Sequence, residues 1–307
     1  MRRVLPALAL AAALAGCGLG AGQGSSGTHL VVTADFGARR VAELARPEVS
    51  GDDTVMRLLQ RNARVQTRYG GGFVQSIDGL GGGRRDGRPI DWFYFVNGVQ
   101  AGKGAAATRL HDGDRIWWDR HDWSVTPDVK AVVGSFPEPF LHGLGGHRLP
   151  VRVECVQPRS EPCDAVNHRL TGLGVPAARG LFAGSSAAET LRVVVGTWAQ
   201  LRDDPALARI ERGPRASGVY ATITADGRRI TALDARGRVA RRFGAGTGLV
   251  AATRFGDDKP VWVVTGTDEA GVAAATRGFD EETLADRFAL VVSNDLPVSV
   301  PVAEARR

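Results

Sequence analysis

The chain has 307 residues, of which 43% are hydrophobic and 23% are charged, and this ordinary composition excludes a wholly disordered or fibrous protein. The net charge of +6 is spread out: 15 basic residues accompany 13 acidic ones between Thr28 and Lys130, and 22 accompany 20 from Ala131 onward. Because the sequence shows no basic run or face, nucleic acid is not an expected partner. A chain of this length predicts about two domains.

The first residues predict an export signal. Two arginines precede an apolar run over residues 4–14, which is too short to remain as a membrane-spanning helix. The Leu-Ala-Gly-Cys segment that ends at Cys17 resembles the lipobox of bacterial lipoproteins. The resemblance implies that residues 1–16 are a removed signal peptide and that Cys17 carries acyl chains such as palmitate. The protein would then be anchored on the extracytoplasmic face of the cell membrane. The alternative is an ordinary signal peptide cut near Ala21.

Residues 17–28 are rich in Gly and Ser and predict a flexible tether. The first folded unit is expected over residues 29–130, where short alternating segments are separated by turns. Strands are expected over residues 29–36, 39–47, 73–77, 92–96 and 115–123, with one helix that Asp52 or Asp53 caps and that ends at Arg61. This order predicts an N-terminal β-grasp (ubiquitin-like) domain, in which the helix covers one face of a mixed sheet.

Two motifs in this unit carry a family resemblance. Trp92-Phe-Tyr-Phe-Val-Asn-Gly98, followed by Leu110-His-Asp-Gly-Asp-Arg-Ile-Trp117, is similar to the signature of the transcobalamin-like C-terminal domain family. The resemblance covers about one third of the chain. It implies capture of a small molecule such as cobalamin or another corrinoid; an adaptor that contacts another surface protein is the alternative use of the same fold.

Aromatic residues give the candidate ligand site. Four of the six tryptophans lie in this unit, and Trp117 and Trp118 are consecutive, so on a regular strand they point to opposite faces. One of these two is expected on the face away from the helix, exposed as an anchor for a ligand or partner. The predicted ligand-binding residues are Trp92, Tyr94, Asn97, Trp117 and Trp118.

Residues 131–148 are predicted to be a linker, and residues 149–307 a mixed α/β domain of unknown role. Strands are expected over residues 151–156, 191–195, 219–224, 229–233, 261–264 and 288–292, with helices over residues 198–210 and 269–277. Similar blocks that begin at Gly180 and Gly248 raise two alternatives, an internal duplication or coincidence.

The two remaining cysteines, Cys155 and Cys163, form an even pair in an exported chain, which predicts a disulfide. The His and Asp residues between His111 and Asp122 are interpreted as a solvated strand face and a turn, so no metal site is predicted. No catalytic motif is present, so no enzyme and no cofactor are expected.

These features predict a lipid-anchored extracytoplasmic binding protein that captures a small nutrient, such as a corrinoid, for a membrane transporter component. The alternative is a protein–protein interaction module in a cell-envelope complex with no small ligand.

The lipobox generates the first testable prediction. Cys17→Ser removes the acylated thiol, so the protein should be released from membranes or remain unprocessed. Fractionation and the mass of the mature N-terminus measure this. A variant that is correctly cleaved and still membrane-bound would show that Cys17 is not the anchor.

Overall fold

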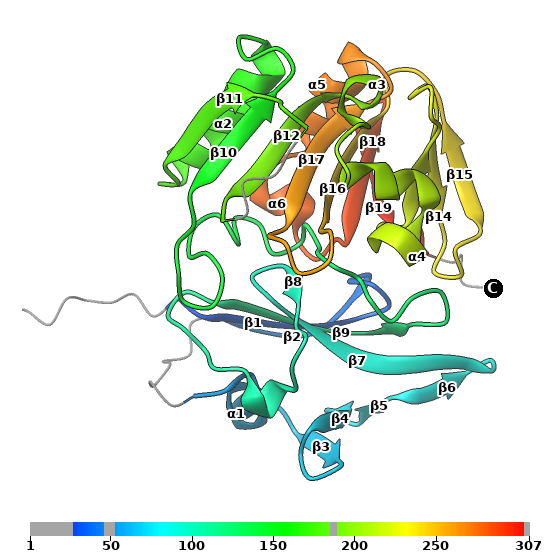
Figure 1. Ribbon diagram of the computed structural model, residues 1–307. Helices are drawn as coiled ribbons and strands as arrows, with labels where there is room; N and C mark the ends of the chain where they lie inside the picture. The colour runs from blue at the N-terminus through cyan, green and yellow to red at the C-terminus, as the bar shows by residue number, and fades with distance from the viewer. Residues whose placement is uncertain (1–26, 46–52, 185–188, 304–307) are drawn as a thin grey trace, which may run out of the picture.

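The computed structural model describes residues 27–45, 53–184 and 189–303 of the chain. The predicted signal peptide, Cys17 and most of the predicted tether lie outside the described residues. The described fold is mixed α/β and mostly sheet, and Figure 1 shows two layered halves, one from β1 to β9 and one from β10 to β19. Within the described ranges, no helix has the length and apolar character needed to cross a membrane.

The first half contains a six-stranded sheet in the order β2-β1-β9-β7-β6, with β8 paired to β7. Its β1 and β9 strands are parallel and the other neighbours are antiparallel, so the sheet is mixed. The strands are β1 (His29–Ala34), β2 (Arg39–Ala45), β6 (Gly83–Arg85), β7 (Arg88–Val96), β8 (Val99–Gln100) and β9 (Arg115–Asp122). A small separate sheet contains β3 (Val65–Arg68), β4 (Phe73–Ile77) and β5 (Leu80–Gly81).

Helix α1 (Val55–Asn62) covers one face of the first sheet, and a single 3₁₀ turn, η1 (Ala105–Ala107), lies beside it. The apolar side chains of α1 recur at helical spacing and pack on those of β1, β7 and β9. Thr54 is the N-cap, since its hydroxyl accepts from Arg57 N at 3.2 Å. The predicted cap at Asp52 or Asp53 is therefore wrong; Asp53 instead accepts from Arg61 at 2.6 Å.

The second half contains a seven-stranded sheet in the order β11-β10-β12-β17-β16-β18-β19. The first four of these strands are parallel and the last three antiparallel. The strands are β10 (Val151–Cys155), β11 (Ala177–Leu181), β12 (Leu191–Thr197), β16 (Gly248–Thr253), β17 (Val261–Gly266), β18 (Ala289–Ser293) and β19 (Leu296–Val300). A three-stranded sheet contains β13 (Ala221–Ile223), β14 (Ile230–Leu233) and β15 (Val239–Phe243).

Helices of the second half lie on both faces of the large sheet. Helices α2 (Glu161–Gly172) and α5 (Glu269–Arg277) pack on one face, and α6 (Glu281–Leu284) contributes Leu284 to the same core. The opposite face packs on α3 (Trp198–Leu201), η2 (Leu207–Arg212), the β13–β15 sheet and the first half. The short α4 (Pro214–Ser217) follows η2. Apolar runs in β12, β16 and β17 agree with strands that are buried on both faces.

Two helical regions of the second half differ from the prediction. The single helix expected over residues 198–210 is wrong, because α3 ends at Leu201 and η2 begins at Leu207. Pro205 lacks an N–H, and the Asp204 carboxylate accepts from Ala206 N at 2.9 Å, so the chain starts a new turn there. Helix α2 was not predicted, because its first turn lies in the Pro- and Ser-containing segment between the two cysteines.

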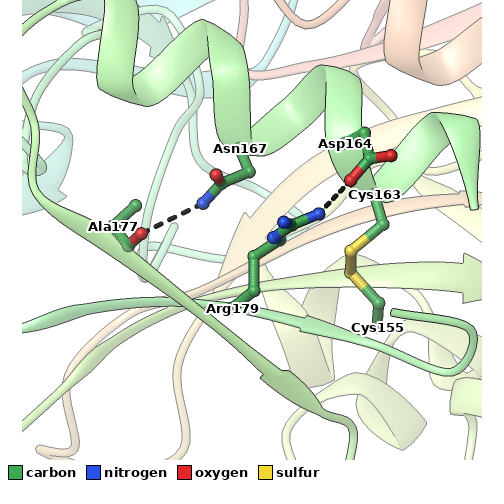
Figure 2. Close-up of a disulfide and its surroundings, with 6 residues drawn as sticks. All are labelled: Cys155, Cys163, Asp164, Asn167, Ala177 and Arg179. Carbon is green, nitrogen blue, oxygen red and sulfur yellow. Dashed lines mark hydrogen bonds and ion pairs between the residues drawn. A yellow bond between two sulfur atoms is a disulfide. The ribbon is translucent and has the colours of Figure 1, made fainter. Parts of the chain in front are cut away.

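The predicted disulfide is present. Cys155 at the end of β10 and Cys163 in the first turn of α2 are bonded, with Cα atoms 6.1 Å apart (Figure 2). On the same helix, Asn167 donates to Ala177 O at 3.1 Å, and Asp164 pairs with Arg179. The bond and these two contacts hold α2 between β10 and the edge strand β11.

The segment predicted as a linker is packed. Val132 belongs to the core shared by the two halves, whereas Phe136 and Phe140 pack with Trp262 of β17. Val133 N donates to Phe288 O at 3.2 Å, which adds a backbone bond to the second half.

Glycines allow α5 to approach the large sheet closely. A Cβ on Gly271 would lie 2.3 Å from Thr247 O, and one on Gly266 would lie 2.3 Å from the Gly271 carbonyl carbon. Backbone atoms cannot move aside as a flexible side chain can, so this first turn of α5 requires glycine.

Gly271→Ala should therefore lower the free energy of unfolding by about 3 kcal/mol, as expected for overpacking against backbone. The matched control is Gly172→Ala at the end of α2, where an added Cβ meets nothing within 4 Å. The control should leave stability unchanged or raise it by up to about 1 kcal/mol. Chemical denaturation of both variants measures the difference, and equal stabilities would contradict the close contact.

Candidate functional site

Three of the predicted ligand residues lie in the core beneath α1. Trp92, Tyr94 and Trp118 are all buried on this face of the sheet, and the rings of Tyr94 and Trp118 stack with centroids 4.8 Å apart. Trp92 Nε1 donates to Leu80 O at 3.0 Å, and the Tyr94 hydroxyl donates to Lys103 O at 2.6 Å. The polar atoms of Trp92 and Tyr94 are thus bonded within the fold, whereas Trp118 Nε1 is buried with no hydrogen-bond partner among the described residues. All three side chains pack in this core.

Trp117 points to the opposite face, as its position next to Trp118 predicts. The expectation that one of the pair is exposed is wrong, since each is only 2% exposed. The second half covers the face away from α1: the Phe288 ring lies 5.2 Å from that of Trp117. Whether either tryptophan contacts a ligand stays a prediction, and contact would require the surrounding core to open.

Asn97 is buried in the β7–β8 turn, where Asn97 and Gly98 have the positive φ values expected of an Asn-Gly hairpin. Its amide donates to Asp114 Oδ1 at 2.9 Å and to Gly143 O at 2.8 Å, and its oxygen accepts from Arg115 N at 2.8 Å. Burial raises the pKa of Asp114, although bonds from His111 and Asn97 oppose the shift. Asn97 thus joins the β7–β8 turn to Gly143 in the packed segment over residues 131–148.

The Asp and His residues of β9 are buried, so their interpretation as a solvated strand face is wrong. Strand β9 is central in its sheet and has a packed core on each face, which leaves Asp119, His121 and Asp122 without solvent. Asp119 accepts from the backbone N–H groups of Phe36 at 3.1 Å and Gly37 at 2.9 Å. Among the described residues, no group of three or more His, Cys, Asp or Glu side chains is arranged to hold a metal ion.

A pocket of about 460 Å³ opens where the two halves meet. We call it the interface pocket. It is lined by Asp35, Phe36, Ala38, Arg39, Arg85, Asp86, Arg88 and Asp122 of the first half and by Ala235, Pro301, Val302 and Ala303 of the second. Three guanidinium groups therefore lie beside three carboxylates at the edge of the shared core.

Ion pairs organise this lining. Arg88 Nη1 lies 2.5 Å from Asp122 Oδ2, and this pair is mostly shielded from water. Arg85 Nη2 lies 2.9 Å from Asp35 Oδ1, and this pair is partly exposed.

Two buried polar atoms have no hydrogen-bond partner among the described residues: Arg88 Nε and the Tyr220 hydroxyl. Burial, with the charge of Asp122, raises the pKa of Tyr220, so that hydroxyl stays protonated.

The interface pocket was not predicted, because its residues come from separate turns, from the ends of β7 and β9 and from the segment that follows β19. The charged residues in the β1–β2 and β6–β7 turns could have indicated this site. Each turn taken alone, however, is typical of an exposed turn between two strands. Only the arrangement of the two halves brings them together.

Residues 52–122 match the model of a family described as a domain of unknown function (DUF4430). This match covers α1 to β9. No curated protein matches the chain. Among solved structures, one from Ruminococcus gnavus, described as "a putative metal binding protein", aligns with 15% identity over 31% of this chain and 96% of its own, at a TM-score of 0.25. A similarity at this level carries no argument about function.

The burial of both tryptophans generates a prediction. Trp117→Ala and Trp118→Ala should each lower the free energy of unfolding by about 3–5 kcal/mol, because each leaves a large cavity in a packed core. Trp123 is half-buried and donates to Asp91 Oδ2 at 2.8 Å, so Trp123→Ala is the matched control and should cost less. Denaturant titrations give the three values. If either core variant were as stable as the wild-type protein, that tryptophan would not be buried in a packed core, and the expected exposed anchor would be supported.

Proposed function

We propose that the protein is a lipid-anchored extracytoplasmic binding protein that captures a small charged molecule in the interface pocket for a membrane transporter component. The observation that carries this proposal is the mixed-charge lining of a pocket to which both halves contribute. Ligand sites commonly lie between two packed bodies and hold a few convergent polar groups.

The charges suggest the ligand chemistry. Arginines bind carboxylates through paired N–H groups, and carboxylates accept from ammonium groups. Arg39 and Arg85 are exposed at the rim and compete for the single carboxylate of Asp35, at 3.9 and 2.9 Å. A ligand carboxylate that entered here would give one of these guanidinium groups a second partner. A small organic acid or amino acid fits this chemistry.

Finer features of the fold support the same class of function. The mixed sheet under α1 is compatible with the β-grasp architecture, and the resemblance to the transcobalamin-like family implies a corrinoid ligand. A pocket of about 460 Å³ lies within the range of about 300–1,000 Å³ that is usual for small-molecule sites, and its charged walls favour a small charged molecule over a corrinoid. An internal duplication of the second half is a separate proposal. Strand β12 leads into α3 and β17 leads into α5, although the two helices differ in length.

The proposal is tested by calorimetric titration with glutamate, citrate and cobalamin. Glutamate or citrate should bind, and Arg85→Ala should weaken that binding about tenfold, the loss expected for one charge-assisted contact. The control is Arg84→Ala, because Arg84 is its exposed neighbour on β6 but does not line the pocket. Absence of heat with all three compounds, or an equal loss in both variants, would favour the adaptor function instead.

A further inference from the structure

The β3–β4 hairpin carries an exposed aromatic pair. Tyr69 is 86% exposed and Phe73 is 36% exposed, and their rings meet edge to face with centroids 6.3 Å apart. Three glycines, residues 70–72, separate them at the tip. Large apolar side chains at a loop tip lose contact with water only when another surface covers them, so this pair indicates a contact site.

Three arginines lie on the hairpin and the neighbouring helix. Arg57, Arg64 and Arg68 are all exposed on α1 and the start of the hairpin, and the Arg64 side chain is 90% exposed. Asp53 pairs with Arg61 at 2.6 Å and Asp78 lies 3.8 Å from Arg64, so with Arg57 and Arg68 this region has four arginines for two described carboxylates. Aromatic rings flanked by arginines suit the boundary between an anionic membrane surface and water, where rings enter the headgroup region and guanidinium groups meet phosphates.

We propose that the β3–β4 hairpin, with Tyr69 and Phe73 at its tip and Arg57, Arg64 and Arg68 beside it, docks on the anionic lipid surface to which the chain is tethered. This inference rests on the proposed anchoring for its orientation. Eleven residues separate Cys17 from His29, and the twelve Cα-to-Cα steps span at most about 40 Å, comparable to the diameter of a fold of this size. The membrane is thus within reach of the first half, from which the tether departs.

The arrangement of the halves agrees with this orientation. Figure 1 shows α1, β3 and β4 on the side of the first sheet that faces away from the second half. Docking there leaves the rim of the interface pocket, which lies between the halves, open to the extracytoplasmic space. A protein surface is the other class of partner that an aromatic tip could contact, but the surrounding positive charge favours lipid phosphates.

Sedimentation with vesicles tests the proposal, using the chain from Gly18 onward, which contains every described element and lacks Cys17. The wild-type chain should bind vesicles of phosphatidylcholine and phosphatidylglycerol more tightly than phosphatidylcholine alone, and less tightly at high salt. Tyr69→Ala/Phe73→Ala should weaken binding about tenfold, because two rings no longer enter the headgroup region. Arg64→Glu should weaken it about fivefold, and only on the anionic vesicles.

Two matched variants locate the effect. Leu181→Ala/Leu296→Ala removes two side chains that are 66% and 64% exposed on the second half. Arg241→Glu/Arg242→Glu reverses two exposed charges on β15. Both should bind vesicles like the wild-type chain. Failure of the wild-type chain to bind, or an equal loss in either control, overturns the proposal. Because the assayed chain lacks Cys17, neither result depends on lipidation, and the Cys17→Ser experiment fails or succeeds separately.

Discussion

The insertion of Phe288 beneath the first sheet holds the two halves of this molecule together. Phe288 precedes β18, and its ring lies 5.1 Å from that of Phe36, 5.6 Å from Phe95 and 5.2 Å from Trp117. The aromatic side chains of the first sheet thus surround one side chain of the second half. With the other side chains of the shared core, this contact keeps the apolar face of β7 and β9 away from water.

The position of Phe36 depends in turn on a buried carboxylate. Asp119 binds the Phe36 and Gly37 amides and the Thr33 hydroxyl, and Trp117 Nε1 donates to Thr33 Oγ1 at 2.7 Å. A Cβ on Gly37 would lie 1.7 Å from Asp286 O, so the β1–β2 turn is pressed against the segment that carries Phe288. A buried charge is stable only when its hydrogen bonds are satisfied, which explains why the turn and the strand form one unit.

Local patterns predicted much of the first half but not what covers it. The strands around Trp92 and Trp117 followed from alternation, and the turn at Asn97-Gly98 from turn chemistry. The burial of Trp117 could not be predicted, because Phe288 is distant in sequence and no local signal pairs them. The same limit applied to Asp119 and His121, whose polar side chains suggest solvent until the strand is known to be central. The interface pocket was the feature least predictable from local sequence patterns, since its walls depend on contacts between the halves.

The interface pocket follows from this arrangement. The aromatic residues of the shared core exclude water, whereas at its edge Arg88 and Asp122 form an ion pair 2.5 Å apart. Phe36 contributes to both the interface pocket and the shared core. It lines the pocket, and its ring stacks on that of His121 with centroids 4.5 Å apart. A ligand at the pocket would therefore contact a side chain that the Asp119 network fixes and that Phe288 touches. Under the proposed function, ligand binding at this edge would be coupled to the packing of the two halves, since both depend on the position of Phe36.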